Sequence, residues 1–338
     1  MTIYRKFLWC LPPSLALVAS AYYGLFLYQF GAPIQTTYGV ADWATFKKQI
    51  ANSVSGERIL LFGDSSSLLG MDTPLLEKTT GRKVVNMALH GGFPLDWVAE
   101  FALENARPGD TVVMSLAWTY YFRDFKQPEK WMLDQIVAWD HQYFYDLDTI
   151  TKARFIAGLD INSLVFNINT KINKKIITHD FPDRRTLTDD EVRERWSTSH
   201  SAQPFSYSFL NISQHGDLQG ACGNPEVSFS SFKFPAKGIQ PNAFELLEET
   251  AKKMKAKGIR FLMTPSISLA DEASQDDNYR KVLQEIMTNL KKREIEIAGT
   301  PDDFYFSRSD FYDTNFHLNC EASSKRTLKL YEAIKDSI

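Results

Sequence analysis

Two patterns of hydrophobic positions follow one another along the chain. From Phe7 to Phe30 the chain is almost continuously apolar, whereas beyond residue 42 short apolar runs alternate with amphipathic stretches. Short runs that end at glycine or proline predict buried strands, and the amphipathic stretches predict helices. Before residue 125, the predicted strands are 58–62, 83–87 and 111–116, and the predicted helices are 42–52, 73–80 and 94–106.

The alternation stops at about residue 125 and returns at residue 242. The segment 125–240 is rich in Asp, Asn, Ser and aromatic residues without a clear period, which predicts an insertion or lid. Beyond it, the predicted strands are 260–263 and 294–297, and the predicted helices are 242–257, 278–293 and 321–338. Strands joined by helices indicate an α/β fold with a parallel sheet, whose strands all end at one edge.

The apolar run at the start predicts a membrane anchor. Arg5 and Lys6 precede it, and the first acidic residue is Asp42. About 20 apolar residues suffice for a helix to cross a bilayer, and positive charge ahead of the span favours a cytoplasmic N-terminus. A cleaved signal peptide is the alternative, because residues 18–21 resemble a small-residue cleavage site. We favour the anchor because the run continues from Tyr22 beyond that site.

These patterns predict an anchor and linker over residues 1–41 and an α/β domain over residues 42–338. The 338 residues are 44% hydrophobic, which is enough for a full core. The chain has 38 basic and 41 acidic residues, so its net charge of −3 provides no broad positive surface for nucleic acid. Nucleic-acid binding is therefore not expected.

Three cysteines and six histidines are available as ligands or disulfide partners. Cys10 lies in the apolar run, which leaves Cys222 and Cys320 in the exported part. A disulfide between them is compatible with an oxidising compartment, and two unpaired buried thiols are equally compatible with the sequence. The spacings C-x-x-C and H-E-x-x-H are absent, so the sequence predicts no metal site, and we expect no cofactor.

The first candidate for chemistry is Gly63, Asp64 and Ser65, at the end of the first predicted strand. This edge is where α/β sheets build their sites. Gly63 permits a tight turn, the hydroxyl of Ser65 can act as a nucleophile, and the following amides can stabilise an oxyanion. The alternative is that Asp64 and the serines only cap the next helix.

Two further segments can complete such a site. Gly91 follows the second strand, and a glycine there lets a backbone N–H approach a bound carbonyl oxygen. Asp313 and His317 are four residues apart, so one helical turn would let Asp313 orient His317 as the base for Ser65. The alternatives are a plain turn at Gly91 and a capping aspartate beside a surface histidine.

In order and placement, these residues resemble the first, second and last sequence blocks of the SGNH (GDSL-like) hydrolase superfamily. The resemblance covers about residues 58–115 and 260–338. It implies a flavodoxin-like α/β/α fold, acyl transfer or ester hydrolysis, and an oxyanion hole made by the amides of the serine and the block-two glycine. The residues that carry it are Gly63, Asp64, Ser65, Asn86, Gly91, Asp313 and His317. We assign Ser65, His317 and Asp313 to catalysis, and Gly91, Asp64 and Asn86 to the oxyanion and substrate-binding set.

The chain departs from the family pattern at two places. The third block normally offers an Asn after the third strand, where this chain has residues 116–120, Leu-Ala-Trp-Thr-Tyr. The acid normally precedes the histidine by three positions, where this chain has Thr314. With the anchor, these departures resemble a divergent branch that includes the D-alanyl-transfer protein of teichoic acid systems and the alginate O-acetylation proteins.

That branch implies an extracytoplasmic, serine-dependent acyltransferase that moves an O-acetyl or similar group to a cell-envelope or exported polysaccharide. The partners would be the polysaccharide acceptor, an acyl donor and a multi-span membrane O-acyltransferase. Two alternatives remain open. One is an esterase or lipase of the same fold with water as the acceptor, and the other is a catalytically silent scaffold that binds glycan or a membrane protein.

Overall fold

The computed structural model describes residues 3–177, 179, 181, 183–200, 205–225 and 228–338. The chain divides into two compact units. The N-terminal unit is Met1–Tyr38 with Lys126–Thr186, and the sheet unit is Gly39–Phe125 with Leu187–Ile338. This division differs from the predicted one, because the first half of the expected insertion belongs to the same unit as the N-terminal helix.

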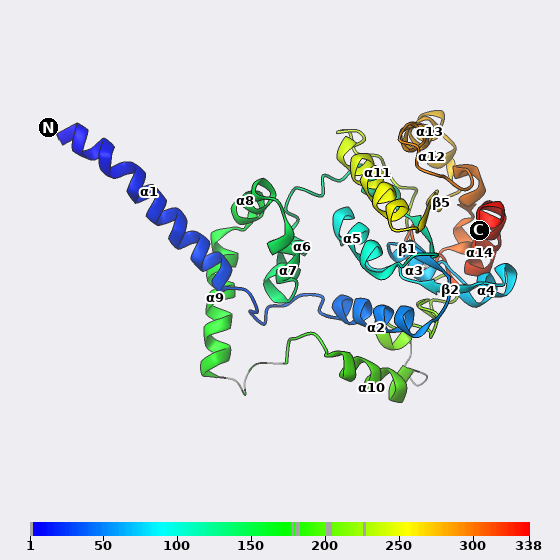
Figure 1. Ribbon diagram of the computed structural model, residues 1–338, viewed down its shortest axis with the longest axis horizontal. Helices are drawn as coiled ribbons and strands as arrows, with labels where there is room; N and C mark the ends of the chain where they lie inside the picture. Colours follow the sequence, from blue (N-terminus) through cyan, green and yellow to red (C-terminus); the bar gives the residue numbers. More distant parts are fainter. Residues whose placement is uncertain (1–2, 178, 180, 182, 201–204, 226–227) are drawn as a thin grey trace. The chain divides into compact units, whose positions relative to one another are not determined.

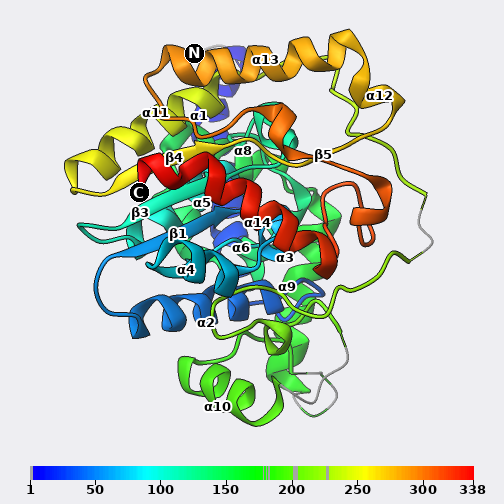
Figure 2. The same ribbon diagram turned by 90° about the vertical axis from the view of Figure 1, so that its right-hand side faces the viewer.

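The sheet unit contains a parallel sheet of four strands in the order β2-β1-β3-β4. Gly63 pairs with Ser115, and Ser115 pairs with Thr264, so three strands end at the same level. Figure 2 shows these strands side by side. The strands are β1 (Arg58–Gly63), β2 (Lys83–Asn86), β3 (Thr111–Ser115) and β4 (Arg260–Thr264). A separate parallel pair is formed by β5 (Ser268–Leu269) and β6 (Tyr305–Phe306).

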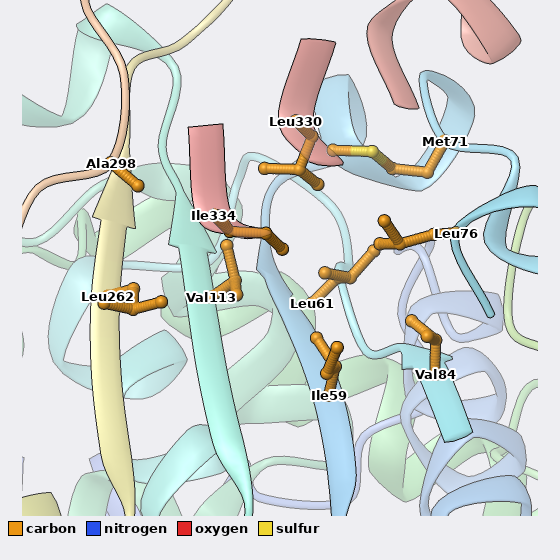
Figure 3. Packing of buried hydrophobic residues seen from close by; sticks show 10 residues of the cluster. All are labelled: Ile59, Leu61, Met71, Leu76, Val84, Val113, Leu262, Ala298, Leu330 and Ile334. Atoms are coloured by element: carbon orange, nitrogen blue, oxygen red, sulfur yellow. The ribbon is translucent and has the colours of Figure 1, made fainter. Parts of the chain in front are cut away.

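Helices cover both faces of the sheet and make the three-layer α/β/α arrangement that the alternation predicts. On one face, Ile59 and Leu61 of β1 pack with residues of α4 and α14, including Leu76 and Leu330 (Figure 3). Because strand side chains alternate between faces, Phe62 points to the other side, where its ring meets Phe101 of α5.

The helices of the sheet unit are α2 (Gly39–Ser53), α3 (Ser65–Leu69), α4 (Thr73–Thr80), α5 (Leu95–Asn105), α10 (Asp189–Ser199), α11 (Pro241–Ala256), α12 (Glu272–Gln275), α13 (Asp277–Lys292) and α14 (Cys320–Ile334). The predicted strand over 294–297 is wrong. Glu294 has a φ of 57° in the turn after α13, so only Ile297 reaches β4, as a single bridge to Met263.

The N-terminal unit is helical. Its helices are α1 (Ile3–Tyr28), α6 (Lys130–Ala138), α7 (His141–Asp146), α8 (Thr149–Gly158) and α9 (Ile161–Ile176) (Figure 1). Within α1, the stretch Phe7–Tyr28 is long and apolar enough to cross a membrane. The end of α1 belongs to the core of the unit, since Phe26 is fully buried and its ring lies 5.1 Å from that of Phe144.

The predicted irregular segment is therefore largely helical from residue 130 to 199. Its helices are short and begin at polar caps: Asp148 caps α8, Asp160 caps α9, and Thr188 forms a capping box with Glu191 at α10. Capping residues and frequent Asn interrupt the hydrophobic period over the shorter of these helices. Helix α9 does keep an apolar residue at every third or fourth position, and the prediction of an irregular segment overlooked this period.

A buried ion pair fixes the start of the sheet. Arg58 opens β1 and Asp110 precedes β3, and each side chain is at most 1% exposed. One carboxylate oxygen of Asp110 accepts hydrogen bonds from the backbone N–H and the Nε of Arg58, at 3.0 and 3.1 Å. The other accepts from the Arg58 Nη2 and from the Arg107 amide.

Removing one partner of this pair should lower the stability of the folded protein. Asp110→Ala leaves the Arg58 charge buried without a counter-charge, and we expect a loss of about 3 to 5 kcal/mol in the free energy of unfolding. The control is Glu104→Ala, which removes only the exposed pair with Lys48 and should cost less than about 1 kcal/mol. Urea unfolding in detergent, followed by circular dichroism, measures both, and equal losses would contradict the assignment.

Candidate active site

The turn after β1 is shaped by Gly63. Its φ is 151°, and a Cβ atom at this position would lie 2.0 Å from the carbonyl oxygen of Ser115 on β3. Any side chain would therefore collide with the neighbouring strand, so only glycine fits. The chain leaves the sheet at this point and places Ser65 at the start of α3.

Asp64 ties this turn to the loop after β3. Its carboxylate accepts a hydrogen bond from the Ser66 amide at 2.8 Å and another from the Ala117 amide. The side chain is 1% exposed, so it is not available to a substrate. The assignment of Asp64 to substrate binding is corrected: its carboxylate is directed inward and supports the turn that carries Ser65.

Ser65, His317 and Asp313 lie together in a chain of hydrogen bonds. The Ser65 Oγ is 2.8 Å from the His317 Nε2, and the His317 Nδ1 is 2.8 Å from the Asp313 Oδ1. A turn between Thr314 and His317, whose backbone groups are 3.4 Å apart, brings the acid and the histidine onto one side despite the extra residue between them. When Nδ1 donates to Asp313, the unprotonated Nε2 can take the proton of the Ser65 hydroxyl.

A tyrosine that the sequence did not point to completes this group. The Tyr207 hydroxyl donates a hydrogen bond to the second oxygen of Asp313 and lies 3.3 Å from the His317 Nδ1. Burial raises the pKa of Asp313, but the hydrogen bonds from His317 and Tyr207 outweigh burial and hold that pKa below its usual value. Tyr207 belongs to the irregular segment and to no motif, so only the folded chain reveals its position.

Gly91 lies beside the nucleophile. A Cβ atom on Gly91 would be 3.9 Å from the Ser65 Oγ, which is van der Waals contact, so the backbone at Gly91 lies directly beside the hydroxyl. Arg123 holds this loop by donating to the Gly91 carbonyl at 2.8 Å, and the Tyr120 hydroxyl donates to the Phe93 carbonyl at 3.1 Å. The family pattern would place an Asn side chain in the loop after β3. In this chain, the residues of that loop instead support the loop that contains Gly91.

Asn86 is also a supporting residue, and its assignment to the oxyanion and substrate-binding set is corrected. Its side chain is fully buried. The amide group donates to the Ser67 carbonyl at 2.9 Å and to Asp217 at 2.8 Å, while its oxygen accepts from the Ala88 amide at 3.0 Å. Both ends of the side chain are therefore used to hold the loops on either side of it.

A buried arginine lies beneath the turn. Arg326 of α14 donates to the Ser66 carbonyl and, at 3.3 and 3.1 Å, to the hydroxyls of Ser67 and Ser115. Burial lowers the pKa of Arg326 to about 10, although the charge of Asp64 opposes the shift. The guanidinium therefore stays charged at neutral pH and draws the turn and the end of β3 together.

A disulfide between Cys222 and Cys320 closes a loop with a sequence separation of 98 residues. Cys320 begins α14, three residues after His317, so the bridge fixes one end of the loop that carries the histidine. These two cysteines and Glu321 also have potential ligand atoms within 4.8 Å of one another. Because the two sulfur atoms are bonded to each other, they offer no thiolate ligands, and this group does not fit a metal site.

Comparisons with known proteins add little to this picture. No family model matches the chain, and no curated protein matches it. Among solved structures, it is similar to the protein YxiM of Bacillus subtilis, with 11% sequence identity and a TM-score of 0.36. The similarity covers 84% of this chain, which spans a little over half of that structure's length, 57%.

Removing the Tyr207 hydroxyl should slow the reaction of Ser65 without unfolding the site. The Tyr207 side chain is 46% exposed, so solvent screens its hydrogen bond to the Asp313 carboxylate. We therefore expect Tyr207→Phe to lower the rate of labelling by a fluorophosphonate by about threefold to tenfold. The loss of this donor raises the pKa of Asp313. Since orientation of His317 needs the ionised carboxylate, the acid limb of the pH–rate profile should move to higher pH.

Tyr312→Phe is the matched control, because Tyr312 lies one residue from Asp313 and its hydroxyl makes no hydrogen bond to any described residue. This variant should keep the wild-type rate and pH profile. An unchanged rate in Tyr207→Phe, or an equal effect of both substitutions, would show that Tyr207 does not act through Asp313.

Proposed function

We propose that the chain is a serine-dependent acyltransferase that acts at the outer side of the cytoplasmic membrane. The observation that carries the proposal is the hydrogen-bonded series from Ser65 through His317 to Asp313. Each residue has the partner that its role requires: the nucleophile lies against a base, and the base is oriented by an acid. The resemblance to SGNH hydrolases adds the expectation of acyl chemistry.

The reaction would proceed in two steps. First, the Ser65 Oγ attacks the carbonyl carbon of an acyl donor while the His317 Nε2 takes the hydroxyl proton. The donor's leaving group departs with that proton and leaves an ester on Ser65. In the second step, His317 takes the proton of an acceptor hydroxyl, whose oxygen attacks this ester, and the proton returns to Ser65 as the acyl group departs.

Backbone amides would stabilise the negative charge that develops on the carbonyl oxygen in both steps. We propose the amides of Ser65 and Gly91 for this role. Neither amide donates a hydrogen bond to another part of the described chain, so both are available to an oxyanion. Rigid support of the two loops by Asp64, Arg123 and Arg326 would keep these donors in place before the substrate binds.

The compartment and the acceptor are further parts of the proposal. The apolar stretch Phe7–Tyr28, preceded by Arg5 and Lys6, supports a single-pass anchor with the sheet unit outside the cytoplasm. The disulfide Cys222–Cys320 is compatible with an oxidising compartment. By resemblance, the acceptor would be a hydroxyl of a cell-envelope or exported polysaccharide, and a multi-span membrane O-acyltransferase would supply the acyl group.

Competition between acceptors distinguishes the proposed transferase from an esterase. With p-nitrophenyl acetate as donor, we expect wild-type protein to release p-nitrophenol and to acetylate oligosaccharides prepared from envelope polysaccharides, as detected by mass spectrometry. Ser65→Ala should abolish both products. Ser66→Ala is the matched control, because the buried Ser66 hydroxyl has no hydrogen-bond partner among the described residues. Release of acetate alone would favour the esterase, and no turnover by wild type would favour the scaffold.

A further inference from the structure

One face of α9 carries an exposed apolar stripe. Its residues follow one another at intervals of three or four, which places them on one side of a helix. They are Ile161, Val165, Ile168, Ile172 and Ile176. Ile161, Val165 and Ile176 are 69%, 60% and 73% exposed, Ile172 is 39% exposed, and Ile168 is half-buried. Contiguous apolar surface of this kind marks a site of interaction with a protein or a membrane.

The opposite face of α9 is mostly polar and packs against the end of α1 (Figure 1). Its buried residues are Leu164, Asn167 and Thr170. Asn167 is buried and donates to the Gln29 side chain at 2.9 Å, and the Lys171 ammonium donates to the Tyr28 carbonyl at 2.7 Å. In a helix of a water-soluble protein the apolar stripe would face inward. In α9 the apolar stripe faces outward instead, as expected of a helix whose outer side contacts an apolar medium.

The position of α9 along α1 indicates that the apolar surroundings of the stripe are a lipid bilayer. The Tyr22 hydroxyl donates to the Leu159 carbonyl at 3.1 Å, and Tyr22 lies six residues before the end of the apolar stretch Phe7–Tyr28. Six residues of helix correspond to about 9 Å. The junction between α8 and α9 therefore lies beside the last turns of the span, about 9 Å before its end, and the stripe begins there with Ile161.

Charged and aromatic residues at the same level fit lipid head groups. Lys171 and Lys175 lie over the Tyr28 ring, with their Nζ atoms 5.0 and 5.5 Å from its centroid, and Lys174 is also in the last turns of α9. Tyrosine and lysine at a membrane boundary place their apolar parts inward and their polar ends among phosphates. This combination is typical of interfacial amphipathic helices.

We infer that α9 lies in the interfacial layer of the bilayer that α1 crosses, with Ile161, Val165, Ile172 and Ile176 inserted among the acyl chains. The occupant of the stripe is phospholipid, bound by its acyl chains at the apolar residues and by its phosphate at the exposed Lys175. The inference rests on the anchor role of α1 and is independent of the acyl-transfer chemistry of the sheet unit. It assigns a second membrane contact to the N-terminal unit.

A fluorescent probe at Val165 tests this inference in the full chain. In a Cys10→Ser background, where the remaining cysteines form the disulfide, Val165→Cys carries an NBD label and the chain is reconstituted in vesicles of phosphatidylcholine and phosphatidylglycerol. We expect blue-shifted emission and loss of fluorescence when nitroxide lipids are included. The control label is at Lys130→Cys on α6, whose side chain is 78% exposed, and it should show neither effect.

An unshifted, unquenched label at Val165 in vesicles that hold the anchored chain would overturn the inference. If the label is shielded in native membranes but not in pure lipid, the stripe binds another membrane protein, which also overturns it. A double substitution distinguishes contact of the stripe with lipid from packing of the stripe against protein. Val165→Asn with Ile172→Asn should return an NBD label at Ile176→Cys to aqueous emission without lowering the thermal midpoint, and a lowered midpoint would show that the stripe packs against protein.

Discussion

The hydrogen bond between the Ser65 Oγ and the His317 Nε2 joins two residues that are 252 positions apart in the chain. A contact of 2.8 Å across such a separation requires that both loops be fixed independently. The Ser65 loop is fixed by Gly63, whose missing side chain lets β1 turn against the Ser115 carbonyl. The His317 loop is fixed by its own turn and by the disulfide at Cys320. If either support failed, the base would lose the nucleophile.

Helix α14 connects these two supports. It begins at Cys320, directly after the histidine loop, and carries Arg326 beneath the turn of the nucleophile. Buried charges are costly unless they are paired and hydrogen-bonded. The carboxylate of Asp64 accepts hydrogen bonds from two backbone amides of the loops that it holds. Arg326 donates to the Ser66 carbonyl and to two serine hydroxyls, while its Nε has no partner among the described residues. These hydrogen bonds beneath the site hold the turn that carries Ser65 against the end of β3 and the loop that follows it.

The sequence alone predicted the parts of this structure that depend on local patterns. Strand and helix alternation indicated β1 to β4 and the layers around them, and the short motifs indicated Ser65, His317 and Asp313, which the fold brings together. It did not predict the contribution of Tyr207, which reaches Asp313 only through tertiary folding. It also assigned Asp64 and Asn86 to the substrate, because a motif does not show which way a side chain points.

Covalent labelling of the nucleophile shows whether His317 activates Ser65. The full chain in detergent is treated with a fluorophosphonate, and the modified residue is identified by mass spectrometry. We expect a single adduct on Ser65, none in Ser65→Ala, and almost none in His317→Ala with the fold intact by circular dichroism. Absence of an adduct in folded wild type, or undiminished labelling of His317→Ala, would show that His317 does not activate Ser65.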